Sequence, residues 1–390
     1  MLNGARHSAR VAFGDVVRLS RERTKDPDAD GFDRYVGLDH IDPGSLKIRR
    51  WGDVADGTTF TNVFRPGQVL FGKRRAYQRK IAIADFTGVC SGDIYVLESK
   101  DPSELLPELV PFICSTEEFF DHAVSTSAGS LSPRTNWNSL SSFEFVLPSL
   151  KEQKRIVAAV SAIIRYQDSL IAIGSALSRS VKSMRAEFFD PSRLSAKRLA
   201  DYCDGGRGIK IGPFGAQLHQ SDYITDGVPV VMPVNMRGDR IDRDGISTIS
   251  ESKARELQVH RLQPGDILLP RRGELDRRAF VTSAEDGWIC GTGSLRIRVA
   301  DNSIPSVALL HALASVHSVQ WLLSKSVGTT MPNLNSTIVS QIPVAIPDNN
   351  LESILACLDE LENARTSVSV RTKNARRLLR ELSRRALGMS

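Results

Sequence analysis

Basic residues cluster at two matched places in the sequence, each just after a short apolar run that begins with Pro-Gly. The first cluster follows residues 66–72 and contains no acidic residue, and the second follows residues 264–270. Guanidinium and ammonium groups in loops neutralise phosphates, and arginine can also bind the edge of a guanine. A single cluster could equally be a solvated loop, but recurrence at matched positions favours nucleic-acid binding. The predicted contact residues are Lys73, Arg74, Arg75, Arg79 and Lys80 in the first cluster and Arg271, Arg272, Arg277 and Arg278 in the second.

Two polar segments, residues 125–134 and 326–335, are rich in Ser, Thr, Gly and Asn. Such side chains donate hydrogen bonds to phosphates and base edges, although each segment taken alone is typical of an ordinary loop. Residues 371–385 of the last expected helix are also basic, which is more typical of a solvated helix face. The contacts predicted in the polar segments are Ser130, Arg134, Thr329, Thr330 and Asn333.

No catalytic pattern is recognisable in the sequence. The glycines of residues 205–212 have neither dinucleotide-binding nor Walker A spacing, and no zinc-peptidase or serine-hydrolase signature occurs. His311 and His317 are six residues apart on an expected helix and therefore face different sides. Asp266 and Glu274 could form a nuclease acid pair, but Gln68 occupies the position that matches Asp266, which favours a structural turn. We predict no catalytic residue, metal site or cofactor site in this chain.

The basic clusters belong to an internal repeat with a period of about 199 residues. Pro66-Gly67 matches Pro264-Gly265, and the glycines and prolines of residues 127–148 recur in the same order in residues 326–347. Glycine and proline impose particular backbone angles, so shared positions imply shared turns. The sequence therefore predicts two copies of one module.

Each module is expected to be mixed α/β. Apolar runs bounded by turn residues predict strands, and two longer runs, residues 105–114 and 307–323, predict helices. The predicted strands are residues 68–71, 81–84, 94–97, 230–232, 267–269, 279–282 and 295–299.

A long helical pattern ends each copy. Ser149 and Glu152 have capping-box spacing, Asn349 and Glu352 repeat it, and Asp190-Pro191 should stop the first helix. Apolar residues then recur at alternating steps of four and three over about 35 residues, on the order of 50 Å of helix. Each helix could pack on its own module, but two equal seams favour an antiparallel pair between the modules. The seams are Ile156, Val160, Ile163, Leu170, Leu177, Val181, Met184 and Phe188, and Ile354, Leu358, Leu361, Arg365, Val368, Thr372, Ala375, Leu379, Leu382 and Ala386.

Composition sets broader limits. The chain has 390 residues, 41% of them hydrophobic and 25% charged, which is ordinary globular composition. Its net charge of +6 is a weak indication of a polyanionic partner. Five scattered cysteines without a Cys-x-x-Cys pattern favour reduced thiols in the cytoplasm. We find no secretory signal and expect no membrane-spanning segment.

Several segments resemble the specificity (S) subunit of type I restriction-modification enzymes. They include residues 66–73, residues 88–91, the run Leu147-Pro148-Ser149-Leu150-Lys151-Glu152-Gln153-Lys154-Arg155-Ile156, and residues 212–230. The resemblance covers essentially the whole chain. One departure is the start of the second helix, residues 347–352, which lacks the Gln-Lys-Arg-Ile run and puts equivalent partner contacts there in doubt.

The resemblance implies DNA recognition without catalysis. Two target-recognition domains would each read half of a bipartite site in double-stranded DNA, and two conserved helices would set the gap and dock two methyltransferase subunits. S-adenosylmethionine would bind those subunits, and a further motor-nuclease subunit would cleave unmodified DNA. A rod near 50 Å would span roughly one and a half turns of B-DNA. The residues expected in the seam or at the docked partner are Gln153, Arg155, Ile156, Val160, Ile163, Leu170, Leu177, Ile354, Leu358, Leu361, Val368, Leu379 and Leu382.

The expected fold is mixed α/β, with recognition domains at residues 1–148 and 191–347 and antiparallel coiled-coil helices at residues 149–190 and 348–390. Two alternatives remain open at this level. A stand-alone regulator would bind DNA tightly without a methyltransferase subunit. An autonomous nuclease would cleave DNA with a metal ion and depend on Asp266 or Glu274.

Overall fold

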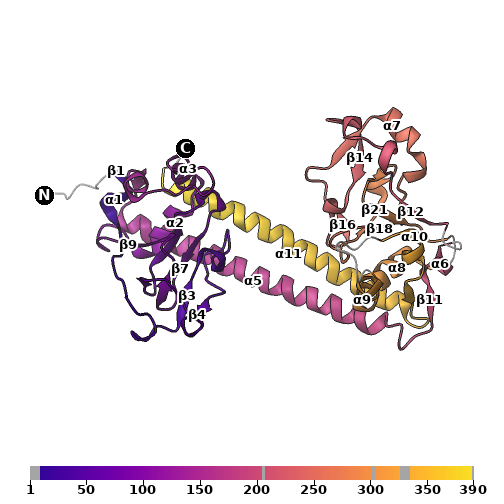
Figure 1. Cartoon of the computed structure of the whole chain (residues 1–390), viewed down its shortest axis with the longest axis horizontal. Coiled ribbons are helices and arrows are strands. Elements are labelled where there is room, and N and C mark those ends of the chain that lie inside the picture. Colours follow the sequence, from indigo (N-terminus) through magenta and orange to yellow (C-terminus); the bar gives the residue numbers. More distant parts are fainter. Residues whose placement is uncertain (1–8, 204–206, 301–303, 326–333, 389–390) are drawn as a thin grey trace. The chain divides into compact units, whose positions relative to one another are not determined.

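The computed structural model describes residues 9–203, 207–300, 304–325 and 334–388 (Figure 1). The backbone divides into two compact units. The first comprises residues up to 172 together with those from 369 onward, and the second comprises residues 173–368. Both boundaries fall inside long helices, so each unit contains one part of each helix.

The first unit contains two four-stranded sheets, ordered β2-β9-β6-β7 and β4-β3-β8-β5, and a two-stranded ladder of β1 with β10. The first sheet is antiparallel throughout, and the second has one parallel pair, β3 with β8. The strands are β1 (Ala9–Ala12), β2 (Val17–Leu19), β3 (Arg34–Val36), β4 (Gly52–Asp53), β5 (Asn62–Phe64), β6 (Val69–Gly72), β7 (Ile81–Ile83), β8 (Gly88–Cys90), β9 (Ile94–Ser99) and β10 (Glu144–Leu147).

Short helices cover the first sheet of this unit. They are α1 (Phe13–Val16), α2 (Val110–Cys114), α3 (Glu117–Ser125) and α4 (Trp137–Ser141). Thr116 caps α3, because its side chain accepts a hydrogen bond from the N–H of Phe119 (3.3 Å). Aromatic rings dominate the core beneath, where Phe13, Phe71 and Phe119 are fully buried and pack edge to face.

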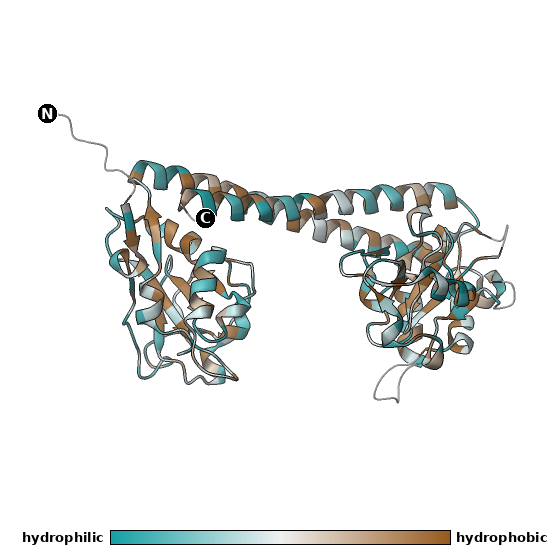
Figure 2. Ribbon diagram, turned by 90° about the horizontal axis from the view of Figure 1, so that it is seen from above, coloured by the Kyte–Doolittle hydropathy of each residue, from teal (hydrophilic) through white to brown (hydrophobic). Residues whose placement is uncertain are grey.

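The second unit repeats this plan. Its sheets are ordered β12-β21-β18-β19 and β13-β17-β14-β20, with two ladders, β11 with β22 and β15 with β16. The strands are β11 (Ala196–Arg198), β12 (Ile209–Ile211), β13 (Tyr223–Ile224), β14 (Val228–Val231), β15 (Met236–Arg237), β16 (Arg240–Ile241), β17 (Ser247–Ile249), β18 (Ile267–Pro270), β19 (Ala279–Phe280), β20 (Ile289–Cys290), β21 (Ser294–Ile297) and β22 (Pro343–Ala345). The helices are α6 (Leu199–Tyr202), α7 (Glu251–Glu256), α8 (Ser306–Leu313), α9 (Val316–Lys325) and α10 (Ser336–Ser340). In Figure 2 the strands inside each unit are coloured as hydrophobic.

The internal repeat predicted from the sequence is confirmed by the topology of the two units. Strands β6 and β18 take the same place in four-stranded antiparallel sheets of the same order. The turns before them carry Gly67 and Gly265 at φ values of 87° and 93°, which a residue with a Cβ rarely adopts. Cys90 and Cys290 each lie on a strand paired in parallel, opposite Val36 and Val231.

Two long helices, α5 (Leu150–Phe188) and α11 (Leu351–Ala386), run through both units. Ser149 caps α5 as predicted, with its hydroxyl accepting from the N–H of Glu152 (3.3 Å), whereas α11 begins after Asn350 rather than Asn349. In the first unit, Ile156 and Val160 share a buried cluster with Leu387. In the second, Val181 shares one with Ile354 and Leu358. The start of one helix thus packs on the end of the other, as an antiparallel coiled coil requires.

Two expected helices differ from the sequence prediction. Residues 105–114 form a 3₁₀ turn followed by only one turn of α-helix, because Pro107 and Pro111 remove backbone donors. Residues 307–323 break into α8 and α9, which are bent by 62°. Ser315 causes the break between α8 and α9, since its hydroxyl accepts from the N–H of Ser318 (3.3 Å) and starts a new helix.

A test of length and composition for membrane-spanning segments selects helix α5, and a core helix of a soluble protein can pass the same test. By length and composition α5 is apolar enough to cross a membrane, with a mean hydropathy of 1.5 in its most apolar 18-residue window. The bent pair α8–α9 passes the same test only if it is taken as one span. Residues of α8 such as Leu309 and Ala312 are buried in the core of the second unit, and this burial explains the apolar composition of the α8–α9 pair.

Candidate nucleic-acid interface

In the first unit the basic loop after β6 and the polar segment after α3 lie side by side. We call this surface the platform; it comprises residues 73–75 and 128–135. The N–H of Thr135 donates to the carbonyl of Lys73 (3.0 Å), and the N–H of Arg75 donates to the carbonyl of Pro133 (2.7 Å). Backbone pairing therefore brings together two segments that the sequence singled out separately.

A single carboxylate positions two cations of the platform. Asp93 accepts a hydrogen bond from Nη1 of Arg74 (3.2 Å) and another from Nε of Arg134 (2.8 Å). Partial burial alone would raise the pKa of Asp93, but the bonds from Arg134 and Arg74 outweigh it and hold that pKa below its ordinary value. Both arginines remain partly exposed, at 37% for Arg74 and 50% for Arg134. Each guanidinium has five N–H donors, so both can bind a phosphate while Asp93 fixes their positions.

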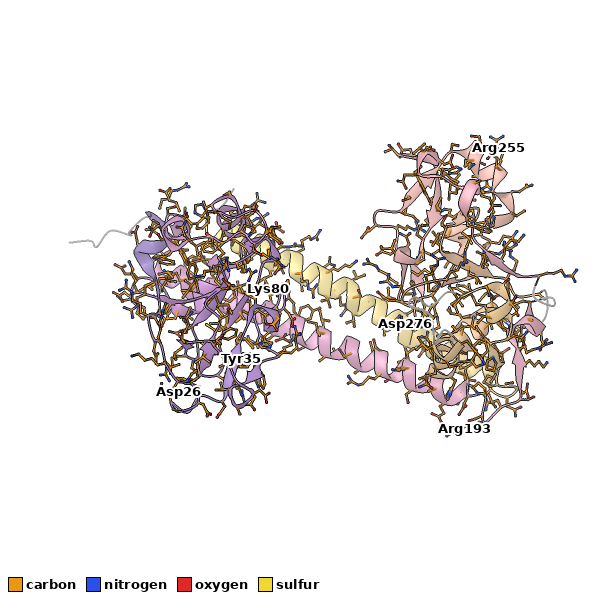
Figure 3. The ribbon with its side chains drawn as sticks, in the orientation of Figure 1. Asp26, Tyr35, Lys80, Arg193, Arg255 and Asp276 are labelled. Carbon is orange, nitrogen blue, oxygen red and sulfur yellow. The ribbon has the colours of Figure 1, made fainter. Side chains whose placement is uncertain are left out.

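The other cations of the first basic cluster have contacts within the chain. Nζ of Lys73 lies 4.8 Å from the centre of the Tyr95 ring. Arg79 pairs with Glu117 on α3, and Lys80, labelled in Figure 3, donates to the carbonyl of Leu38 (2.5 Å). Ser130 is exposed on the platform. Arg79 and Lys80 thus contribute less free charge than their sequence suggests.

Between Arg75 and Arg79, a single 3₁₀ turn (Ala76–Gln78) presents Tyr77, whose exposed fraction is 54%. The residues on either side of the turn, Arg75 and Arg79, have left-handed backbones with φ values of 54° and 55°. Such angles are uncommon for residues with a Cβ and often occur at functional sites.

The second unit brings equivalent segments together. The N–H of Leu334 donates to the carbonyl of Arg271 (2.8 Å), which matches the bond between Thr135 and Lys73. Arg272 is exposed and forms no hydrogen bond or ion pair with any described residue. Thr329, Thr330 and Asn333, which we predicted as contacts, lie outside the described residues.

Arg278 corrects one of our site assignments. Its side chain is only 11% exposed, with Nε 3.1 Å from a carboxylate oxygen of Asp239 and Nη1 donating to the carbonyl of Leu313 (3.1 Å). Burial lowers the pKa of Arg278, although Asp239 opposes that effect. Its charge is matched inside the unit by Asp239, unlike the charge of the exposed Arg272. Arg277 is less buried and pairs with Glu274 (2.7 Å).

Asp239 belongs to a buried charged network that joins the second module to the long helices. Arg185 on α5 donates to Asp239 (2.6 Å), to Glu362 on α11 (3.1 Å) and, through Nε, to Nδ1 of His311 on α8 (3.1 Å). Burial first, and then the charge of Arg185, lowers the pKa of His311 to about 4. A neutral ring is also what the bond requires, because Nδ1 must accept. The sequence prediction missed this network, since its members are far apart along the chain.

The acid pair considered for a nuclease is structural. Asp266 is 1% exposed, accepts from the N–H of Gln263 (2.8 Å) and forms two hydrogen bonds of 2.7 Å with Arg298. Gln68 closes the matching turn of the first unit, because its side chain accepts from the N–H of Arg65 (2.7 Å). The structural turn role that we preferred for Asp266 is therefore the observed one.

Gln153, from the most characteristic run of the sequence, is 1% exposed. Its amide accepts from the N–H of Leu106 (2.8 Å) and donates to the carbonyls of Glu104 (2.8 Å) and Pro148 (3.0 Å). No polar atom is left for a partner, so Gln153 fixes the start of α5 to its own unit instead. Arg155, by contrast, is exposed and pairs only loosely with Glu152 (3.4 Å).

Most of the remaining seam residues are buried or half-buried in the helix pair. The most buried are Val160 and Leu358, both with no exposed surface. The others assigned to the seam or docked partner are not exposed either: Ile156, Ile163, Leu170, Leu177, Ile354, Leu361, Val368, Leu379 and Leu382.

Within the described residues, no group of three or more His, Cys, Asp or Glu side chains could hold a metal ion. Four of the cysteines are buried, and burial raises the pKa of Cys90, Cys203 and Cys290 to about 12. Their thiols therefore stay protonated at neutral pH and are poor nucleophiles.

Residues 20–174 match the family described as type I restriction modification DNA specificity domain. The chain is also 30% identical, over 145 residues, to the type I restriction enzyme EcoDI specificity subunit of Escherichia coli. That match covers 35% of this chain and 31% of the relative.

Solved structures extend the likeness to the whole fold. A type I restriction-modification system S subunit from M. genitalium has a TM-score of 0.58 at 16% identity, covering 98% of this chain and 97% of its own. A chain from a structure concerned with assembly and conformational transition of the type I R-M system has a TM-score of 0.54 at 20% identity, covering 99% of both. The resemblance predicted from the sequence is thus confirmed: residues 20–174 match the type I restriction modification DNA specificity domain, and the chain has the fold of the type I specificity subunits.

Proposed function

We propose that this chain is the non-catalytic DNA-recognition subunit of a type I restriction-modification complex. Each unit reads one half of a bipartite site in double-stranded DNA. The observation that carries the proposal is the repeated pairing of a basic loop with a polar segment, through Lys73 and Thr135 in one unit and Arg271 and Leu334 in the other. Cations held on paired backbone in this way can bind phosphates and base edges at defined positions.

The long helices dock two methyltransferase subunits, and through them the motor-nuclease subunits. Exposed apolar side chains on the helices support this role. In the first unit these include Tyr166 (47%) and Ile171 (37%) on α5, and Val370 (52%) and Leu378 (53%) on α11. Apolar surface of this kind on a helix pair is typical of protein interfaces. A stand-alone regulator would have no use for it. S-adenosylmethionine binds the methyltransferase subunits, and the complex acts in the cytoplasm, where its DNA substrate and reduced thiols are found.

The test is to co-express the chain with the methyltransferase subunit encoded beside it and to map methylated adenines across the genome. We expect a bipartite methylation pattern, and a purified assembly of two methyltransferase subunits with one recognition subunit. A methylation pattern without two separated half-sites, or no assembly, would refute the proposal. Tight specific binding by the chain alone, with no methyltransferase dependence, would support the regulator instead.

A matched pair of substitutions distinguishes the two units. Arg134→Ala changes the first platform, and Arg272→Ala changes the equivalent surface of the second unit. We expect each substitution to affect methylation at one half-site only. An arginine that contacts a base should relax preference at one position by about 1–3 kcal/mol, whereas a phosphate contact should weaken binding to all sequences.

A further inference from the structure

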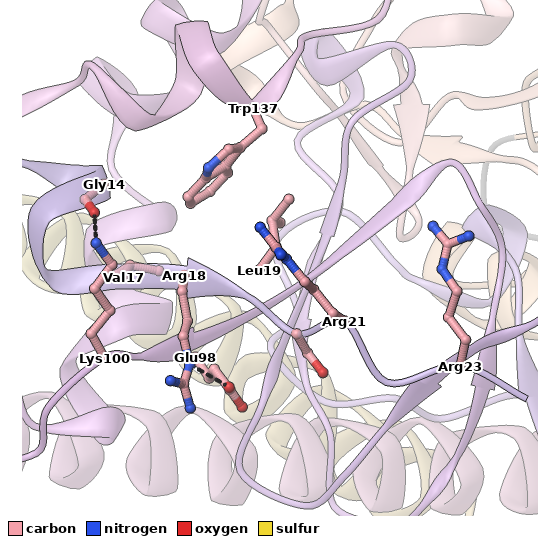
Figure 4. A pocket seen from close by; sticks show the side chains of 10 residues that line it. Gly14, Val17, Arg18, Leu19, Arg21, Arg23, Glu98, Lys100 and Trp137 are labelled. Atoms are coloured by element: carbon pink, nitrogen blue, oxygen red, sulfur yellow. Dashed lines mark hydrogen bonds and ion pairs between the residues drawn. The ribbon is translucent and has the colours of Figure 1, made fainter.

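A groove in the first unit lies beside the platform and was not predicted from the sequence (Figure 4). Its volume is about 920 Å³, and it runs along β2 and the residues that follow it, with Trp137 of α4 on the opposite wall. Four of its lining residues are cations and one, Glu98, is an acid; the cations are Arg18, Arg21, Arg23 and Lys100.

Two of these cations already form hydrogen bonds within the unit. Arg18 donates to Glu98 (2.8 Å), and Lys100 donates to the carbonyl of Gly14 (2.5 Å). Arg21 and Arg23 are exposed, and neither side chain forms a hydrogen bond or ion pair with any described residue. In Figure 4 both extend from the segment after β2 without a dashed line.

The backbone explains why these two arginines are together. After β2 the chain stays extended, and the carbonyl of Glu22 accepts from the N–H of Val63 on β5 (3.0 Å). Successive side chains of an extended segment alternate between faces. Glu22 therefore turns away to pair with Arg65, while Arg21 and Arg23 share the opposite face, about 6.6 Å apart along the chain.

Aromatic side chains connect the groove to the platform. The rings of Trp137 and Tyr95 have centroids 6.3 Å apart. The hydroxyl of Tyr95 lies 3.4 Å from the carbonyl of Thr135, and Lys73 lies over the Tyr95 ring. The groove and the platform are therefore neighbouring parts of one surface of the first unit.

We propose that this groove binds the sugar-phosphate backbone of the DNA strand that crosses the platform, with Arg21 and Arg23 contacting successive phosphates. The inference rests on the proposed function and adds a phosphate-contact site to it. An elongated anion fits these observations because two guanidinium groups without a described partner lie along the segment after β2, and the same groove also contains Arg18 and Lys100. Glu98, already bonded to Arg18 and Gln68, offers no unmatched negative charge to repel it.

The first test measures how DNA affinity depends on salt, with the full chain in its methyltransferase complex. Each phosphate contact contributes about 0.9 to the slope of log K against log salt, so R21A/R23A should flatten that slope by about 1.8. Affinity at 0.1 M salt, one decade below 1 M, should fall about 60-fold, and R21K/R23K should keep most of the slope. The matched control R10A/R193A removes the same charge from exposed positions outside the platform, the groove and the long helices, and should leave the slope unchanged.

The second test locates the DNA directly. Cys357 is the one exposed cysteine, so in a C357S background the variant R21C would carry an iron-EDTA reagent at a single accessible thiol. We expect backbone cleavage beside one half-site and none beside the other. Cleavage at neither half-site, or a slope for R21A/R23A equal to that of the parent, would overturn the groove assignment. Saturable binding of inorganic phosphate that R21A/R23A abolishes without changing the DNA slope would also overturn it. If the parent complex itself binds no DNA, the proposed function fails, and that result is distinct from the others.

Discussion

Replacing Arg185 with alanine should strongly destabilise the second unit. The side chain is 8% exposed and makes hydrogen bonds to Asp239, Glu362 and His311. Removing it leaves two carboxylates in a buried site, although Asp239 keeps Arg278 at 3.1 Å and Glu362 keeps Arg365 at 2.7 Å. Burial already raises the pKa of Glu362, so this carboxylate is poorly solvated even with its partners present.

The size of the loss follows from these contacts. Removing one member of a buried ion pair costs about 3–5 kcal/mol, and a hydrogen bond to a charged group contributes about 1.5–3 kcal/mol. Because each carboxylate keeps one arginine, we expect a loss of about 4 kcal/mol in the free energy of unfolding. This is close to a thousandfold change in the unfolding equilibrium.

Hydrogen exchange followed by mass spectrometry can measure this loss in each unit separately. Amides of β18 and β21, in the core of the second unit, should lose about a thousandfold in protection. Arg155→Ala is the matched control, because its ion pair with Glu152 is exposed and such pairs contribute at most about 1 kcal/mol. Arg185→Lys keeps the charge and should lose less than Arg185→Ala. A loss below about 1 kcal/mol for Arg185→Ala would show that the network does not hold the module to the helices.

Three further predictions concern buried polar groups. The pKa of His311 is about 4 in the folded state against 6.5 in the unfolded chain, so the free energy of unfolding should fall by up to about 3 kcal/mol as pH falls from 6.5 to 4. His311→Gln should reduce this dependence of the free energy of unfolding on pH, which urea titrations at several pH values measure. Gln153→Ala should cost about 3 kcal/mol, because three backbone groups lose their partner in a buried site; thermal unfolding measures this, and an unchanged midpoint would contradict it. Asp266→Ala should cost about 3 kcal/mol of stability; metal-dependent DNA cleavage by the purified chain, lost in this variant, would instead support the nuclease.

Features that depend on local backbone geometry were predictable from the sequence. Gly67 and Gly265 marked a turn that needs positive φ, and both have it. The four-three spacing of apolar residues identified the helix seam because that period places them on one face. Shared turn residues and shared periodicity were therefore sufficient for the repeat and the coiled coil.

Features that depend on distant partners were not predictable. Arg272 and Arg278 belong to one basic cluster, yet Arg278 is buried against Asp239 while Arg272 is exposed. The difference comes from tertiary contacts that no local pattern contains. Arg21 and Arg23 lie in a stretch of mixed charge that is typical of a solvated loop. Only the extended backbone separates Glu22 from them and gathers the positive charge on one face.

Comparison of the two units indicates which positions could determine DNA sequence preference. Arg75 and Gly273 occupy matching places and share a left-handed backbone, with φ of 54° and 81°, so the turn is kept although the residue is not. Two residues further on, Tyr77 is 54% exposed in the first unit, whereas Leu275 is 4% exposed in the second. The repeat thus keeps this turn and changes both the side chain and its exposure at the matching position. Identical half-sites would require the same contacts from both surfaces, and these surfaces differ in charge, size and aromatic character. In the proposed complex the two half-sites should therefore be different sequences rather than inverted copies of one.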